Sequence, residues 1–509
     1  MGRTSRSAIQ PVWPSPAPWT GQIHEPGQPQ RSAGGLGARA PCGPTAGTTS
    51  PIQRLNASTI LREPAMFHCL TKSTHQRPCN ASPAGTGHSI TTLILVLACA
   101  PLAAGTVDSG SDGSDGALEL THFQPKTIEL DPRDPTGELG GALDADGDNQ
   151  YHFTSVHIGP NITLELSSRW LGSTPVVWRV SGDVLIEGTI DLDGEPGHDY
   201  GAPSLPSFAG AGGYGGGKGG RLSAPGTAGS GPGAGGYATV NSGGVIGGGA
   251  AAHAANGTDA PAYGNRYLLP LIGGSGGGGG WTNSSNYGVG GAGGGAGGGA
   301  LLIVSETRVA ITGAVTAKGG VGGSTDFRNS LYGIGGGGSG GAIRIVAPVI
   351  DGDGELSVGG SANGFCSYCA TGSGGRIRLE AFDYRFNGTQ TGSGDMVLST
   401  PGIIDMPESA PILRVVSVDG VLVPANPRGY FDPADLEIDA TDPVPFEIEA
   451  PNVPLGTVVD LELVSEVGET TTFSVMLENR NAQGIPVATV NAPVPHGFSR
   501  LHIRADWLD

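Results

Sequence analysis

Basic residues are scarce in this 509-residue chain. It has 27 lysines and arginines against 46 aspartates and glutamates, which gives a formal net charge of −19 at pH 7. A protein that binds nucleic acid or an anionic membrane needs a cationic surface, so the composition argues against both partners. An acidic surface keeps an exported protein soluble, and calcium binding is a further use that it allows.

Sequence motifs of catalysis are missing as well. No His-Glu-x-x-His motif occurs, and no Gly-x-Ser-x-Gly turn has the context of a catalytic triad. The run Gly215–Gly220 resembles a phosphate loop superficially, but the Gly-Lys-Ser/Thr order is absent and no helix can follow. We therefore expect no catalytic residue, no cofactor and no metal site, and predict that the protein is not an enzyme.

Glycine, in contrast, is abundant, with 92 residues concentrated between Gly194 and Gly375. Each glycine inside a helix costs about 1 kcal/mol relative to alanine, so runs such as Gly274–Gly280 and Gly293–Gly299 cannot be helical. A Gly-X-Y period with proline, typical of collagen, is absent. The remaining alternatives are a disordered linker, a polyglycine-II packing of extended segments, or long loops between strands.

The apolar run Ile90–Leu97 is too short to span a bilayer and has the length of a signal-peptide core. Small residues follow it, which predicts cleavage near Ala104. Val96–Cys99 resembles the lipobox of bacterial lipoproteins, so lipidation of Cys99 is the alternative. Either route exports the chain to the extracellular space or the bacterial cell surface, in the second case as an outer-membrane lipoprotein held by a lipid anchor.

The leader divides the first part of the chain into three segments. Residues 1–65 are either a mispredicted start or a disordered extension without packed structure, and Met66 is the better start. Residues 66–104 form the signal-peptide region. Residues 105–117, rich in Gly, Ser and Asp, read as a linker.

Short strands follow this linker. Apolar and β-branched residues alternate or cluster in Tyr151–Ile158, Ile162–Leu166 and Val176–Val180, and turn residues bound each segment. These segments have the length of strands and leave no room for helices. They indicate an all-β protein.

Three segments then repeat one pattern: Val180–Gly194, Ile303–Gly319 and Ile345–Gly359. In each, an apolar strand leads through a glycine corner to a second short strand that ends in glycine. One such unit cannot bury its apolar face alone, so we predict stacked units, a right-handed β-helix or solenoid over residues 118–405. The insert 195–299 must project from this stack, pack against it as extended glycine helices, or stay mobile.

The composition changes at Pro411, where glycine becomes ordinary and alternating strands fill the sequence. Seven strands are expected: Ile412–Val418, Leu436–Ile438, Val444–Ile448, Val458–Val464, Thr472–Leu477, Val487–Val490 and Ser499–Ala505. Seven short strands in about 100 residues are typical of an immunoglobulin-like sandwich, here over residues 411–509.

Taken together, these segments resemble a group of exported glycine-rich bacterial proteins. The resemblance is carried by Asp148–Gly197, by the Gly-Gly-x-Ile-x-Ile-Val units and by the ending Gly497–Trp507, and it covers roughly residues 145 to 509. Most of those proteins have no assigned function. The resemblance implies secretion, solenoid-like repeats and an immunoglobulin-like domain, and it transfers no catalytic residue.

Two cysteines, Cys366 and Cys369, are the only pair in the mature region besides the candidate lipidation site Cys99. Their spacing suits half a zinc site, a redox motif or a disulfide. Zinc needs two more ligands, and a redox motif needs a helix start that this glycine-rich loop does not offer. In an oxidising compartment a disulfide that pins a loop is favoured.

Acidic residues gather at three places. Asp144–Gln150 offers alternating carboxylates like a calcium loop, but Ser155 and Asn149 stand where that loop needs an acid and a glycine, which favours a solvated turn. The other acids end two repeat units: Asp191, Asp193, Glu195, Asp351, Asp353 and Glu355. Stacking could bring them onto one face, as in β-helical glycoside hydrolases, although charged turns are expected at the exposed ends of any solenoid.

Aromatic residues punctuate the glycine: Tyr200, Tyr214, Tyr237, Tyr263, Trp281, Tyr287, Tyr332 and Tyr368. They either cover bare glycine backbone, which we favour, or stack on sugar rings. We predict an exported structural or adhesive surface protein whose partners are extracellular polysaccharide or other cell-surface components. The alternative is a β-helix protein that binds or degrades polysaccharide.

Overall fold

The computed structural model describes residues 7–11, 105–132, 139, 144, 147–200, 206–221, 225–238, 247–257, 260–281, 290–325, 333–361, 370–392, 394–424, 427, 434–440, 443–465 and 471–507. The prediction of an all-β protein is confirmed: the described residues form twenty-five strands and one short helix, α1 (Ser168–Leu171). No helix in these ranges is both long and apolar enough to cross a membrane.

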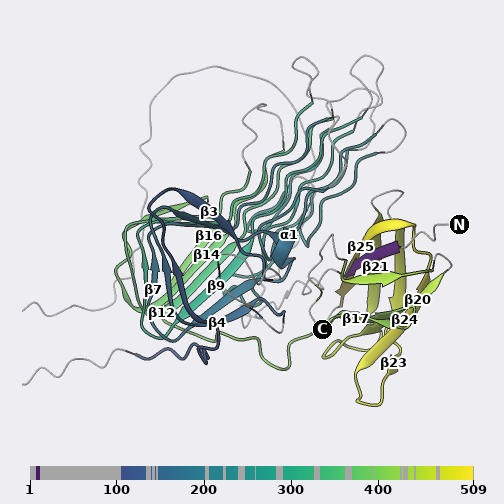
Figure 1. The fold of residues 1–509 in the computed structure, drawn as a ribbon. Coiled ribbons are helices and arrows are strands. Elements are labelled where there is room, and N and C mark those ends of the chain that lie inside the picture. Colours follow the sequence, from purple (N-terminus) through teal and green to yellow (C-terminus); the bar gives the residue numbers. More distant parts are fainter. Residues whose placement is uncertain are drawn as a thin grey trace, which may run out of the picture. The chain divides into compact units, whose positions relative to one another are not determined.

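Two sheets of parallel strands build the first part of the fold (Figure 1). The nine-stranded sheet contains β2 (Gly116–Leu120), β4 (Gln150–Ile158), β6 (Val176–Val180), β7 (Val184–Ile186), β9 (Ala300–Ser305), β10 (Arg308–Ile311), β12 (Ala342–Asp351), β14 (Arg376–Tyr384) and β16 (Asp395–Ser399). The six-stranded sheet contains β3 (Lys126–Glu129), β5 (Ile162–Glu165), β8 (Thr189–Asp191), β11 (Ala314–Thr316), β13 (Glu355–Ser357) and β15 (Thr389–Thr391). The chain alternates between the two sheets, so successive passages add strands to both.

The strands of these sheets are in a register that places similar residues next to one another on neighbouring strands. Leu301 of β9 pairs with Ile343 of β12, which pairs in turn with Ile377 of β14, and all three are almost fully buried. Their side chains share one apolar core with those of the six-stranded sheet, such as Ile190 and Leu356. On one side, β4 pairs with β6 and β7, which follow one another in the sequence, and β12 pairs in the same way with β9 and β10. Because β6 also pairs with β9 and β7 with β10, the pairings of these six strands form a closed ring.

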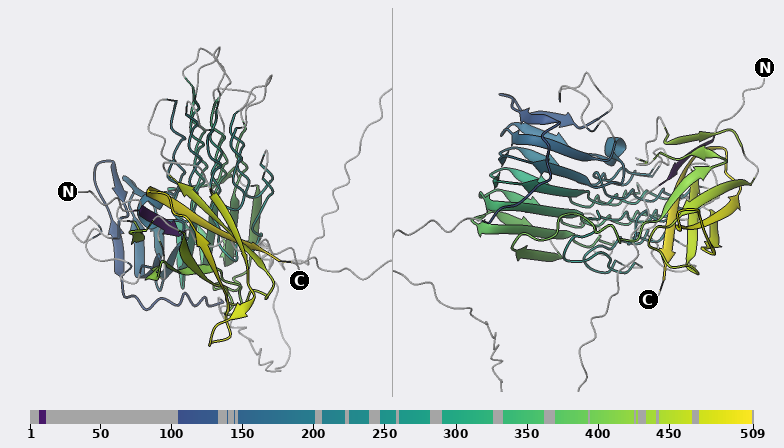
Figure 2. Two further views of the ribbon diagram at one scale, coloured as in Figure 1. Left: turned by 90° about the vertical axis from the view of Figure 1, so that its right-hand side faces the viewer. Right: turned by 90° about the horizontal axis from the view of Figure 1, so that it is seen from below.

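Glycine-rich segments continue directly from the strands and pack side by side, drawn in teal in Figure 1 and seen from two further sides in Figure 2. Their hydrogen bonds have a period of three residues. In residues 291–299, the first N–H of each triplet donates to residues 214–220, the second to residues 333–339 and the third to residues 192–198. Three residues per turn without internal hydrogen bonds is the geometry of the polyproline-II helix, so each segment bonds to several neighbours at once.

This packing leaves no space for side chains. A Cβ added to Gly294 would lie 1.9 Å from the carbonyl oxygen of Gly277, and one added to Gly297 would lie 2.0 Å from that of Gly274. For residues 195–299 we predicted that the segment would project, stay mobile or pack as extended glycine helices. The glycine runs 274–280 and 291–299 pack as extended segments against their neighbours.

Two five-stranded sheets make up the C-terminal part around a second apolar core. One has the order β19 (Leu436–Ile438), β1 (Ser7–Pro11), β25 (Gly497–Asp506), β21 (Val458–Ser465) and β22 (Thr471–Met476). The other has the order β18 (Val421–Leu422), β17 (Arg414–Val418), β20 (Val444–Glu449), β24 (Pro486–Ala492) and β23 (Asn479–Arg480). All seven expected strands are present, and β1 comes from the segment 1–65 for which we expected no packed structure.

Candidate functional site

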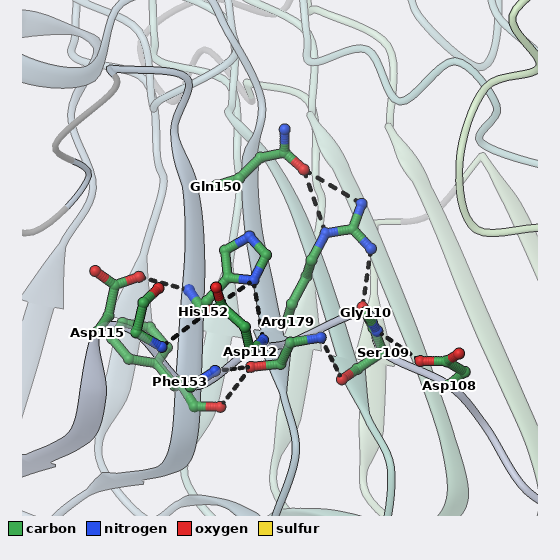
Figure 3. A network of polar contacts seen from close by, with 12 residues as sticks. Asp108, Ser109, Gly110, Asp112, Asp115, Gln150, His152, Phe153 and Arg179 are labelled. Atoms are coloured by element: carbon green, nitrogen blue, oxygen red, sulfur yellow. Dashed lines mark hydrogen bonds and ion pairs between the residues drawn. The ribbon is translucent and has the colours of Figure 1, made fainter.

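The segment expected to be a linker is an ordered strap that lies on the outer face of the nine-stranded sheet (Figure 3). We call residues 105–115 the N-terminal strap. Its turns are stabilised locally, since the Gly110 N–H donates to Asp108 Oδ1 (2.9 Å) and the Ser114 N–H donates to Asp112 Oδ1 (3.0 Å). Gly110 has a φ of +68°, a conformation that side chains disfavour. The Gly/Ser/Asp composition thus encodes a series of tight turns.

Hydrogen bonds hold the strap to β4. Ser111 Oγ donates to the carbonyl oxygen of Phe153 at 2.9 Å. Asp115 and His152 bond twice: the Asp115 N–H donates to the His152 carbonyl at 3.0 Å, and the His152 N–H donates to Asp115 Oδ2 at 2.6 Å. These contacts lead the strap into β2, which pairs with β4.

An apolar contact holds the other end of the strap. Val107 is buried, with 7% of its surface exposed, against Leu302, Val304 and Val346, which point outward from β9 and β12. Ile404, from the opposite end of the chain's path through the parallel sheets, packs on the same patch. The patch is therefore covered by two segments that are far apart in the sequence.

Arg179 of β6 is the centre of the polar contacts around the strap (Figure 3). Its guanidinium donates to the carbonyl oxygen of Ser109 at 2.8 Å and to Gln150 Oε1 at 3.2 Å, and it forms an ion pair with Asp405. Ser109 is fully buried, and its hydroxyl donates to Glu306 Oε1 at 2.9 Å. Sequence reasoning missed Arg179, although its charge at an outward position of a strand bounded by buried residues was a signal.

In the acidic turn that resembles a calcium loop, the carboxylate of Asp144 accepts hydrogen bonds from the backbone of the same turn. Asp144 Oδ1 accepts hydrogen bonds from the N–H groups of Asp148 (2.8 Å) and Asn149 (3.2 Å). Asp148 in turn accepts from Gln150, and buried Asn149 donates to the Leu171 carbonyl at 2.7 Å. The turn thereby fixes the start of β4 beside Arg179.

A row of carboxylates crosses the outer face of the six-stranded sheet. Glu129, Glu165 and Asp191 stand opposite one another on β3, β5 and β8, and we call them the acid row. Burial, followed by the charges of Glu129 and Asp191, raises the pKa of Glu165, and burial raises that of Asp191. Trp170 of α1 donates from Nε1 to Glu129 at 2.8 Å. Like charges in register oppose folding, so this row costs stability.

The acids that end the repeat units do not converge on one site. Asp191 belongs to the acid row, Asp193 forms an ion pair with Lys318 at 3.3 Å, and Glu195 forms one with Arg169 at 3.3 Å. In the other unit, Asp351 lies on β12 of the nine-stranded sheet and accepts two 2.8 Å hydrogen bonds from Arg308. Asp353 is exposed, and Glu355 of β13 stands in register with Ala314 of β11, two strands away from Asp191 and out of the register of the acid row.

Buried charge occurs where the sequence analysis expected apolar strands. Glu380 of β14 is fully buried and its Oε1 accepts from Arg344 (2.9 Å) and Arg378 (2.6 Å), while its Oε2 accepts from the Gly402 N–H (2.7 Å). In β12 and β14 arginine alternates with isoleucine, and this alternation indicated that Arg344 and Arg378 point away from the apolar core. The cluster joins two strands to the chain that follows β16.

The rings of a histidine and a tyrosine stack on each other beside the glycine-rich segments, where they contact the carbonyl oxygens of Gly340 and Gly273. The His253 and Tyr263 rings are 4.8 Å apart, and His253 Nδ1 lies 2.7 Å from the Gly340 carbonyl oxygen. Burial, with the nearby charge of Arg376, lowers the pKa of His253 to about 3, and burial raises that of Tyr263. Both groups stay neutral at physiological pH, which suits packing and not proton transfer.

Several aromatic rings lie directly on glycine backbone. A Cβ on Gly220 would meet the Trp281 ring at 2.3 Å, and one on Gly231 would meet Tyr214 at 2.7 Å. These contacts support the covering role of the aromatics. Tyr287, Tyr332 and Tyr368 are outside the described residues, as are Cys99, Cys366 and Cys369.

The described part of the chain contains no group of three or more His, Cys, Asp or Glu side chains placed to hold a metal ion. Comparison with protein-family models, with curated proteins and with solved structures finds no match. The function must therefore be argued from the geometry alone.

Proposed function

We propose that the chain is an exported structural or adhesive protein of the cell surface. In this proposal residues 118–405 form a right-handed β-solenoid whose glycine segments extend it sideways, and residues 411–509 form an immunoglobulin-like sandwich. The alternation of the chain between two parallel sheets in register supports the solenoid. The separate core between two mainly antiparallel sheets supports the sandwich.

One observation carries the proposal: the glycine segments bond to one another through their backbones in several directions. Such an array is stiff because every segment is held by more than one neighbour. The acids that could serve hydrolysis instead have partners in different places, such as Arg308 for Asp351 and Lys318 for Asp193. A scaffold for adhesion needs this kind of rigidity and needs no reactive group.

The test uses the full chain expressed with its own leader in a bacterium. We expect the mature protein on the cell surface or in the medium, and we expect beads coated with it to retain cells or extracellular polysaccharide without releasing new reducing ends. Turnover of a polysaccharide that is lost in Asp351→Asn or Asp191→Asn would overturn the proposal, as would retention of the chain in the cytoplasm.

A second candidate function is polysaccharide binding at the acid row. It is favoured by Trp170, a half-buried ring beside Glu129, and by the threonine hydroxyls of β5 and β8 that stand two residues from the carboxylates. A glycan-array screen tests it with Trp170→Ala, and Phe123→Ala serves as the control because that ring is 82% exposed elsewhere. Binding that Trp170→Ala leaves unchanged would reject this site.

A further inference from the structure

The chain enters and leaves the parallel sheets at the same place on their outer face. After β16, the chain crosses the nine-stranded sheet as a second strap, residues 400–406, which we call the exit strap. The Gly402 N–H bonds to Glu380 on β14, and the carbonyls of Ile403 and Ile404 accept from Arg344 on β12 at 2.5 and 3.4 Å. Asp405 then reaches Arg179 on β6.

The N-terminal strap and the exit strap therefore meet at two contacts. The polar contact is Arg179, which binds the Ser109 carbonyl of one strap and the Asp405 carboxylate of the other. The apolar contact is the patch on which Val107 and Ile404 pack together. These two contacts link segments that lie almost three hundred residues apart in the sequence.

We propose that these two contacts make the straps a single latch, in which docking of either strap stabilises docking of the other. The side chain of Arg179 is only 11% exposed, and one partner from each strap, together with Gln150, offsets the loss of water around its charge. If the N-terminal strap leaves, Arg179 loses the Ser109 acceptor, and the patch around Ile404 opens to solvent. The exit strap then loses part of its own support.

This coupling goes beyond the proposed scaffold function, because it ties the segment that follows the predicted export signal to the segment that leads into the C-terminal sheets. Coupling of this kind is reciprocal by thermodynamic linkage. A change at the N-terminal strap would therefore reach the exit strap through Arg179 and the patch.

Hydrogen exchange of the full mature chain tests the latch through residues that the mutation does not touch. Asp405→Ala and Ile404→Ala change only the exit strap, and the readout is exchange of the Asp115 amide of the N-terminal strap, which donates to the His152 carbonyl of β4. We expect each variant to speed this exchange by roughly fivefold or more, the usual range of coupling between sites. Val107→Ala should reciprocally speed exchange of the Gly402 amide.

The matched control is Lys318→Gln, which removes the ion pair with Asp193, a pair that contains no residue of either strap. We expect it to leave both amides unchanged. Unchanged strap exchange in Asp405→Ala and Ile404→Ala would overturn the latch. An equal rise in the exchange rates of the β12 amides would also overturn it, because that pattern means that the variant has lost global stability.

Discussion

His157 Nε2 lies 2.9 Å from Glu187 Oε2, so a side chain of β4 is tied to the turn after β7. The other ring nitrogen lies 3.1 Å from Glu119 of β2. One imidazole thus links three neighbouring segments near the end of the nine-stranded sheet. It also gives the fold a dependence on pH.

The hydrogen bond to Glu187 is the main cause that raises the pKa of His157, with Glu119 contributing. A raised pKa means that the folded state holds the proton more tightly, so this stability is fully present below the ordinary value of about 6.5 and is lost as pH rises through the folded pKa. We expect chemical denaturation midpoints to fall from pH 6 to pH 8.5, and His157→Gln to flatten this change. An equal fall in wild type and variant would contradict the prediction.

Glu165 should also make the stability of the fold decrease as pH rises, although it is an acid. Burial and the neighbouring carboxylates raise its pKa, so the charged form opposes folding, and stability falls as pH rises through the folded pKa. We expect Glu165→Gln to raise the melting temperature at pH 7 by removing charge repulsion within the acid row. Glu437→Gln, at an exposed position of β19, is the control. A lower melting temperature in Glu165→Gln would argue against this account.

Gly294→Ala should strongly destabilise the protein, since its Cβ would meet the Gly277 carbonyl oxygen at 1.9 Å. Overpacking of a rigid interior typically costs 1–3 kcal/mol, and here we expect about 3 kcal/mol because backbone must move. Gly359→Ala is the control, because the nearest atom to its Cβ would be 3.9 Å away. Denaturant unfolding measures both, and equal losses would refute the close-packed array.

Glu380→Gln should cost about 3–5 kcal/mol, because it leaves the buried guanidinium groups of Arg344 and Arg378 without a counter-charge. Asp383→Asn breaks the exposed ion pair with Arg385 and should leave the free energy of unfolding almost unchanged, because solvent screens exposed pairs. Unfolding free energies of both variants give the comparison. A small loss for Glu380→Gln would mean that the cluster is hydrated.

Local pattern was enough to predict many of the strands, although not β1, β18 or β23. Tyr151–Ile158 was expected and β4 spans Gln150–Ile158, and Val458–Val464 was expected and β21 spans Val458–Ser465. Alternation of apolar and polar residues reports which face of a strand is buried, and this information lies within a few neighbouring residues. The expected position of Asp191 at the end of a repeat strand was right for the same reason.

The amino-acid sequence by itself determined the all-β character, the strand positions and the exclusion of helix from the glycine-rich region, because these follow from backbone preferences and local periodicity. Only the tertiary structure decided which glycine segments bond to one another and that the Gly/Ser/Asp segment lies on a sheet. It also decided that Arg179 meets both Ser109 and Asp405. Runs of glycine are nearly identical in sequence, so their neighbours are selected by the register of the strands that carry them, and that register depends on contacts between distant parts of the chain.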